Sequence, residues 1–306
     1  KYDMSRDTEK VFKEVHKYLD QNTNENMSMD EMNELIQNFM EQYNGNLPGE
    51  VTEKTAETSD DFYELAENAE TKAQALKFAK KALLLDPDNI DAKVMVTEIT
   101  TEHPYEMVGK YQALIAYAKE VMDRKGYLNE ETIGDYWGIT ETRPFIRLYS
   151  NYLNLLIECG MMRQAARIGE EIIKYNEGDN LGIRFMLMHI YAYLEDEKGM
   201  LELHHKYDKH EETQMLLPIS IAYFKMAEFG KAEEYLRRLA KVNKDTGRFM
   251  RAFLNDTLDK YISRMNAMGY RPFSIEELLV ELHENSYLFE TAPCYFDWAV
   301  QMLKKK

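Results

Sequence analysis

The sequence predicts an all-α fold: an α-α superhelix of stacked helical hairpins, preceded by a smaller N-terminal helical hairpin. Apolar residues recur at the i, i+3, i+4 and i+7 spacing of amphipathic helices along most of the chain. Residues that break helices are few, with 14 Gly and 7 Pro among 306 residues. Between residues 145 and 244 a two-helix pattern returns with a period of about thirty-four residues, a spacing typical of stacked helical hairpins.

The chain carries a net charge of −16, and most of this charge lies at the front. Residues 1–70 hold 18 acidic against 6 basic side chains, whereas residues 71–306 hold 36 against 32. Nucleic-acid binding needs clustered Lys and Arg, so this balance argues against a nucleic-acid partner. No apolar run approaches the roughly 20 residues of a membrane span, which argues against a membrane protein. Two distant cysteines fit a reducing compartment, and we expect a cytoplasmic protein.

The amphipathic pattern divides the chain into three parts. Residues 1–47 contain two apolar stripes, over 7–19 and 30–43, which predict an acidic helical hairpin. Residues 48–59 are rich in turn-forming and polar side chains and predict a linker. Residues 60–306 form the predicted superhelix, which ends in C-terminal capping helices.

The connection between the two N-terminal helices, Asp20–Glu31, resembles a degenerate EF-hand loop. Its oxygen-bearing side chains alternate along the sequence and end in a glutamate, which is the ligand spacing for calcium. Glu25 stands where that family has glycine, and three ligand positions hold neutral Asn. We therefore favour a polar connector, and we expect neither a metal nor another cofactor.

Three helix ends in the predicted superhelix carry specific signals. The first hairpin, over 60–88, is expected to begin at a cap formed by Ser59 and Asp60. A long helix over 105–125 should end at Gly126, the residue type preferred just after a helix. A later helix should begin at Ser274, with Glu277 three residues on as in a capping box.

The three hairpins between 145 and 244 align on one position of their second helices. The residues there are Ala165, Met200 and Ala232, and their numbers place them about 35 and 32 residues apart. A small side chain at such a position lets two helices approach closely. Met200 therefore predicts looser packing in the middle hairpin.

The repeat period and pattern resemble the tetratricopeptide-repeat family. The string WGITETRPFIR runs from Trp137 to Arg147, and GDNLGIR follows at Gly178–Arg184. Together these strings resemble a group of bacterial tetratricopeptide-like proteins of unassigned function, distantly likened to the suppression-of-tumorigenicity-seven family. The resemblance covers about Trp137–Tyr193, and it implies a fold and a kinship without implying an activity.

Tetratricopeptide proteins usually bind extended peptides along the first helix of each repeat, which implies a candidate groove here. Arg147, Asn151 and Asn154 have i, i+4, i+7 spacing and form one stripe. Arg147 and Arg184 are guanidinium forks that can grip a carboxylate. In the alternative interpretation, Glu141 and Glu158 engage these arginines and the contacts are structural. The predicted groove residues are Arg143, Arg147, Asn151, Asn154, Arg184, Phe185, His189, Tyr193, Phe224 and Lys225.

The sequence contains no nucleophile elbow, phosphate-binding glycine loop or zinc-spaced Cys/His set, so we expect no enzyme. His204, His205, Asp208 and His210 form a dense cluster. His204 and Asp208 have i, i+4 spacing that suits a metal, but we favour a solvated helix surface and predict no metal site.

The expected function is a non-catalytic interaction scaffold or adaptor that binds a peptide or helix of a protein partner in the groove. A homo-oligomer is compatible with the sequence. The alternative is a regulatory sensor, in which the N-terminal helix-loop-helix binds a cation or a basic partner and docks on the groove.

Overall fold

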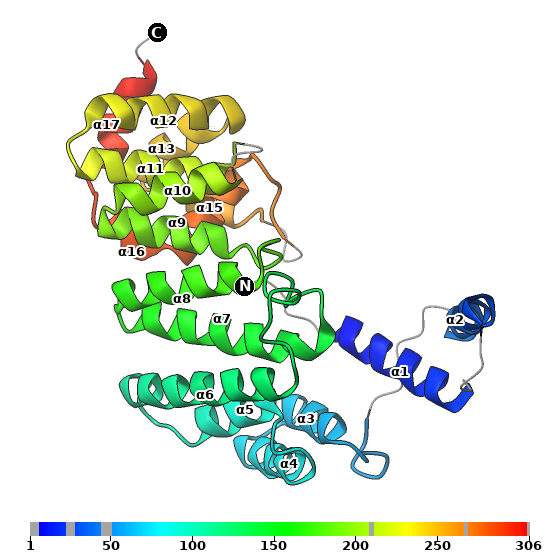
Figure 1. The fold of residues 1–306 in the computed structure, drawn as a ribbon. Coiled ribbons are helices and arrows are strands. Elements are labelled where there is room, and N and C mark those ends of the chain that lie inside the picture. The colour runs from blue at the N-terminus through cyan, green and yellow to red at the C-terminus, as the bar shows by residue number, and fades with distance from the viewer. Residues whose placement is uncertain (1–5, 23–27, 44–50, 208–210, 266–268, 305–306) are drawn as a thin grey trace. The chain divides into compact units, whose positions relative to one another are not determined.

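The computed structural model confirms the all-α class, because helices and no strands occur in the part of the chain that it describes. Contacts divide the chain into two compact units, residues 1–149 (unit 1) and 150–306 (unit 2). Helix α7 crosses this boundary (Figure 1). Among the described helices, none combines the length and the apolar character needed to cross a bilayer. The described residues are 6–22, 28–43, 51–207, 211–265 and 269–304.

Unit 1 begins with a helical pair that carries the rings of Tyr18 and Phe39, 5.3 Å apart, at its interface. Helices α3, α4, α5 and α6 follow, each packed on the next. The helices of this unit are α1 (Asp7–Asn22), α2 (Met29–Tyr43), α3 (Ser59–Glu67), α4 (Lys72–Leu85), α5 (Ile90–Ile99), α6 (Pro104–Arg124), the 3-10 turn η1 (Thr140–Thr142) and the first part of α7 (Arg143–Glu158).

The start of α3 is capped one residue earlier than predicted. The Thr58 hydroxyl accepts a hydrogen bond from the Asp61 amide at 3.2 Å, and the Asp61 carboxylate accepts one from the Thr58 amide at 2.8 Å. This is a reciprocal capping box. Ser59 instead donates its hydroxyl to the Ala82 carbonyl at 2.9 Å, so it ties α3 to α4.

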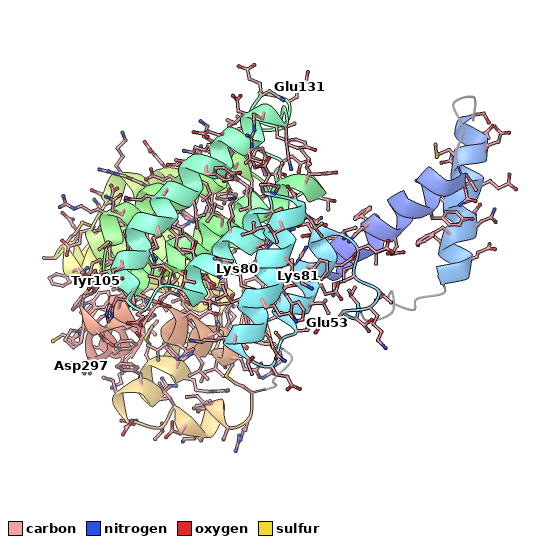
Figure 2. The ribbon with its side chains drawn as sticks, turned by 90° about the horizontal axis from the view of Figure 1, so that it is seen from below. Glu53, Lys80, Lys81, Tyr105, Glu131 and Asp297 are labelled. Carbon is pink, nitrogen blue, oxygen red and sulfur yellow. The ribbon has the colours of Figure 1, made fainter. Side chains whose placement is uncertain are left out.

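Small side chains let α3, α4 and α5 pack closely. Ala79, Ala82 and Ala92 have no exposed surface, and Tyr63 packs against the last two. The opposite face of α4 is exposed, and Figure 2 shows Lys80 and Lys81 projecting from it. The unit is therefore held together by a narrow apolar seam between its helices.

The insertion between α6 and α7 is anchored by buried aromatic rings. Gly126 ends α6 as predicted, with a φ of +76°, and the Tyr127 amide donates to the Met122 carbonyl at 2.8 Å. The Tyr136 hydroxyl donates to the Tyr127 carbonyl at 2.8 Å, and its ring meets Phe145 edge-on at 5.3 Å. The insertion thus belongs to the core of unit 1.

In unit 2 the helices from α8 to α12 lie side by side in succession (Figure 1), and α11 also packs on α9. Helices α15, α16 and α17 pack against α11, α9 and α12 respectively. The helices of this unit are the remainder of α7, α8 (Met162–Tyr175), α9 (Ile183–Leu194), α10 (Glu197–Tyr207), α11 (Thr213–Lys225), α12 (Phe229–Val242), α13 (Thr246–Leu254), α14 (Asp259–Ile262), α15 (Ile275–Glu284), α16 (Ser286–Glu290) and α17 (Tyr295–Lys304).

The middle hairpin, α9 and α10, makes its close approach beside the expected position. Met200 has no exposed surface and belongs to the core. The preceding residue, Gly199, lies so near α9 that an added Cβ would stand 2.9 Å from the ring of Tyr191. A glycine one position away therefore permits the close helix approach that the repeat pattern places at Met200.

The start of α15 is capped by Ser274, as predicted, but with a different partner. The Ser274 hydroxyl accepts from the Glu276 amide at 3.2 Å, and the Glu277 carboxylate accepts from the Phe273 amide at 2.6 Å. Phe273 has a φ of +55°, and this left-handed backbone moves the reciprocal bond back by one residue.

Candidate interaction site

Helix α1 lies along α3 and is joined to it by a row of ion pairs. The residue numbers rise along α1 while those of their partners fall along α3, so the two helices are antiparallel. We call the three partners on α3, which are Asp61, Glu64 and Glu67, the acidic rail. The pairs are Arg6–Glu67 at 3.2 Å, Lys10–Glu64 at 3.2 Å and Lys13–Asp61 at 2.9 Å.

Glu9, a carboxylate on the same face of α1, meets the start of α7, which presents two arginines. Both outer nitrogens of Arg147 donate to Glu9, at 2.5 and 3.2 Å, in a bidentate pair. The Nη1 atom of Arg143 lies 4.0 Å from the same carboxylate. Asp91 of α5 accepts from Nε and Nη2 of Arg147 at 3.0 and 2.6 Å. Arg147 therefore lies between two carboxylates and uses all its nitrogens.

The insertion holds Arg143 in position for this contact. The Arg143 Nε donates to the carbonyl of Trp137 at 2.8 Å, and its guanidinium lies 5.2 Å from the centre of the Trp137 ring. Thr142 donates its hydroxyl to the carbonyl of Tyr136 at 2.6 Å, which closes the turn before α7. The string from Trp137 to Arg147 thus forms one wall of the site.

Burial and charge act against each other at the arginines and carboxylates of this site. Burial alone would lower the pKa of Arg147, but Asp91 and Glu9 outweigh it and raise that pKa above its ordinary value. Burial favours a raised pKa at Asp61, but hydrogen bonds from Lys13 and from nearby donors lower it to about 2. At Glu67 the effect of burial exceeds that of the neighbouring Arg6 and Arg147, and the pKa is raised.

The guanidinium of Arg6 is less completely hydrogen-bonded than the other charged side chains of the site. Its guanidinium stacks over the ring of Tyr63 at 4.5 Å. Its Nε atom is buried and has no hydrogen-bond partner within the described part of the chain, although Glu9 lies 3.5 Å away. A buried donor that stays unsatisfied costs about 1–3 kcal/mol, so α1 is an imperfect occupant at this end.

Of the predicted groove residues, Arg143 and Arg147 lie together in unit 1, but their carboxylate partners differ from those predicted. The structure pairs them with Glu9 and Asp91, whereas Glu141 and Glu158 are both exposed at the surface. Asn151 and Asn154 lie further along α7 in unit 2, one half-buried and the other exposed. They share a helix with Arg147, as the spacing predicts.

Contacts within unit 2 hold the guanidinium of Arg184 in place. It donates to Asp179 at 2.9 Å and to both oxygens of Glu212 at 2.9 and 3.2 Å. Its guanidinium stacks over Phe185 at 4.1 Å. Asp179 also accepts from the amide of Ile183 at 2.7 Å, which caps α9. The string GDNLGIR therefore builds the start of a helix.

The remaining predicted groove residues of unit 2 are covered by its C-terminal helices. His189 has no exposed surface and its Nε2 lies 3.0 Å from Glu281 of α15. The Tyr193 ring lies 5.7 Å from that of Tyr287 on α16. Lys225 donates to the carbonyl of Tyr193 at 2.8 Å, at the end of α9. These side chains are engaged in packing within the unit.

Phe224 belongs to an aromatic cluster at α17. Its ring centre lies 5.5 Å from Tyr295 and 5.2 Å from Trp298. The Tyr295 hydroxyl donates to Ser220 at 2.8 Å, and Ser220 in turn donates to the carbonyl of Ala232. The face of α11 that was predicted to bind a peptide thus carries α17.

The comparisons with known proteins add no name to this arrangement: no protein-family model and no curated protein sequence matches the chain.

Sequence reasoning missed the acidic rail, Glu9 and Asp91, although a signal for most of them is present. Arg6, Glu9, Lys10 and Lys13 have i, i+3, i+4, i+7 spacing, which places them on one face of a helix. The rail residues follow one another at intervals of three, which also gives one face. Two helices with complementary charged faces predict a contact, but Asp91 has no comparable signal.

Two other predicted clusters lie partly outside the described residues. In the EF-hand-like segment, residues 23–27 lie outside the described residues. In the histidine cluster, Asp208 and His210 are also outside the description, while His204 is buried beside the Tyr235 ring at 6.0 Å. His204 is thus a packing residue, rather than the solvated one that was predicted.

Proposed function

We propose that the chain is a non-catalytic scaffold of tetratricopeptide-like hairpins, and that its unit 1 binds a helix of a protein partner. The binding face is the surface between the acidic rail of α3 and the arginines at the start of α7. The successive packing of helices in each unit supports a superhelix of this kind.

One observation carries the proposal: the face of unit 1 already holds a helix, and it holds it by charge. Exposed or half-exposed ion pairs contribute about 0.2–1 kcal/mol each and weaken as salt increases. The Lys10 and Lys13 side chains keep 33% and 37% of their surface exposed. These two rail contacts are therefore weak and favour an occupant that exchanges, whereas the Glu9 and Arg147 side chains keep only 11% and 9% of their surface exposed and form the stronger contact.

The corresponding face of unit 2 differs, and the difference favours unit 1 as the binding unit. There the contacts of α15, α16 and α17 are made by buried rings and by hydrogen bonds between side chains with no exposed surface, such as Tyr295 and Ser220. Buried aromatic pairs add about 0.5–1.5 kcal/mol beyond the area that they bury. These helices are a permanent part of the unit.

The sensor remains the second candidate, because one half of it has a structural counterpart. That hypothesis requires the N-terminal helix-loop-helix to dock on the body of the protein, and α1 does so through Glu9 and Arg147. The other half, a cation or a basic partner bound at the loop, stays a prediction.

A photo-crosslinking experiment tests the scaffold function. Asp60 precedes the acidic rail, its carboxylate lies 4.0 Å from Arg6, and its side chain is 54% exposed. A photoreactive residue at Asp60 should capture a protein partner in the native cells. Glu64→Lys should reduce that adduct, while Glu120→Lys, on the exposed surface of α6, should leave it unchanged. Capture of α1 alone in all three proteins would contradict partner binding.

A further inference from the structure

We infer that α1 occupies the binding face of unit 1 as an intramolecular ligand. The charged face of α1 then has the same charge pattern as the partner helix. The pattern is a basic residue at the first, fifth and eighth positions and an acidic residue at the fourth. In this chain these positions are Arg6, Lys10, Lys13 and Glu9. The inference rests on the proposed function and extends it to the class of partner, an amphipathic helix with this mixed charge.

The register follows from the spacing of both helices. Positions one, four, five and eight of an α-helix fall on one face, so a single side of the bound helix reaches all the contacts. The rail residues Asp61, Glu64 and Glu67 fall on one face of α3 and meet the three basic positions in antiparallel order. A bound helix therefore has one direction and one register on this surface.

The carboxylate at the fourth position sets the specificity. A helix with basic residues throughout this face would bring a positive charge against Arg147 and Arg143. A helix with acidic residues throughout would be repelled by the rail. Like charges placed opposite each other suppress the wrong partners, so the site selects the mixed pattern.

Helix α1 blocks the site because it is tethered to it. A segment of the same chain acts at an effective concentration of about the millimolar range, so even weak ion pairs keep it bound. Its fit is incomplete, since the buried Nε of Arg6 lacks a hydrogen-bond partner among the described residues. A partner helix replaces α1 if it forms better ion pairs with the acidic rail, or if it binds after α1 has been released.

Binding of a labelled α1 peptide to the full chain tests the inference. The peptide covers residues 4–22 and carries a fluorophore, and its anisotropy reports binding. Glu9→Lys in the chain should release its own α1, because a lysine there faces Arg147, while Asp91 still pairs with that arginine. We expect this chain to bind the peptide at least tenfold more tightly than the wild type does.

A charge exchange then tests the register. Adding Glu64→Lys to the Glu9→Lys chain should weaken binding about three- to tenfold, and a peptide with Lys10→Glu should restore it. Adding Glu120→Lys instead is the matched control and should leave the affinity unchanged. Circular dichroism establishes that each variant is folded.

Three results would overturn the inference. The first is equal affinity of the peptide for the wild type and for the Glu9→Lys chain, and the second is failure of the exchanged peptide to restore binding. The third is a wild-type dimer that Glu9→Lys dissociates, which would make a second copy of α1 the occupant. A crosslinked partner without peptide binding would remove this inference alone, whereas peptide binding without a crosslinked partner would remove only the scaffold function.

Discussion

Replacing Glu281 with glutamine should stabilise the protein at neutral pH, although it alters a fully buried contact. The Nδ1 atom of His189 lies 2.7 Å from the carbonyl of Phe185 and donates its proton there. Nε2 then accepts, and the atom that faces it at 3.0 Å is an oxygen of Glu281. Burial lowers the pKa of His189 to about 4 and raises the pKa of Glu281 well above its usual value. The pair is therefore a neutral imidazole with a protonated carboxyl.

The magnitude follows from proton linkage. The pKa of Glu281 is raised in the folded state, so its stabilising contribution is complete below the ordinary pKa of 4.5 and is lost as the pH rises through the folded value. Between pH 4.5 and the folded pKa of Glu281, keeping the proton costs about 1.36 kcal/mol per pH unit. Glutamine donates to His189 from a neutral amide and avoids this cost.

The lowered pKa of His189 changes the free energy of unfolding in the opposite direction with pH. This effect is the same in the wild type and in Glu281→Gln, so it cancels when the two are compared. The pKa of His189 is lowered in the folded state, so the folded protein loses stability as the pH falls from about 6.5 to about 4. Both the wild type and Glu281→Gln retain this loss. The difference in unfolding free energy between them should be near zero at pH 4.5 and grow by about 1.36 kcal/mol per pH unit above it, until the pH reaches the folded pKa of Glu281.

Urea unfolding followed by circular dichroism at several pH values measures this difference. Glu290→Gln changes an exposed glutamate of α16 and serves as the control, with an effect within about 0.5 kcal/mol at every pH. An ion pair between His189 and Glu281 would give the opposite sign, because its loss would destabilise the protein by about 3–5 kcal/mol. Destabilisation of Glu281→Gln at pH 7 would therefore refute the neutral pair.

Three further substitutions should change the urea midpoint in known directions. Gly109→Ala in α6 should stabilise the protein by about 1 kcal/mol, because the added Cβ meets nothing within 4 Å and alanine favours helix. Gly199→Ala should destabilise it by about 1–3 kcal/mol, because its Cβ would lie 2.9 Å from Tyr191; an unchanged midpoint would mean that the ring moves freely. Arg184→Lys should cost about 1–3 kcal/mol, because an ammonium cannot reproduce the bidentate bond to Glu212; equal stability would show that the fork contributes nothing.

Local signals predicted the helices well because they depend on few residues. The apolar stripe over 7–19 corresponds to α1, and Gly126 ends α6 where a left-handed residue is needed. The observed capping residue differs by one position from the predicted one where two neighbouring residues of similar type can both cap the helix. Thr58 and Ser59 can both cap α3, and only the bond from Ser59 to the carbonyl of Ala82 in the next helix decides between them.

The site was harder to predict because its contacts join residues that are far apart in the chain. Arg147 was identified as a carboxylate-binding residue, yet its partners lie 138 and 56 positions away. His189 lies on a helix, α9, as predicted, and no periodicity could indicate that Glu281 would cover it. Sequence patterns indicate which face of a helix is special, but tertiary packing decides what meets that face.

The start of α2 has a consequence for calcium. Glu31 accepts from the amide and the hydroxyl of Ser28, each at 2.8 Å, and its own amide donates to that hydroxyl at 3.3 Å. Both residues are would-be ligands of the EF-hand-like segment. An ion could recruit Glu31 only if its carboxylate left these two bonds to Ser28, so metal affinity and the capping of α2 are thermodynamically coupled. The cap therefore lowers the affinity of the loop for an ion, and binding an ion would cost α2 its capping box.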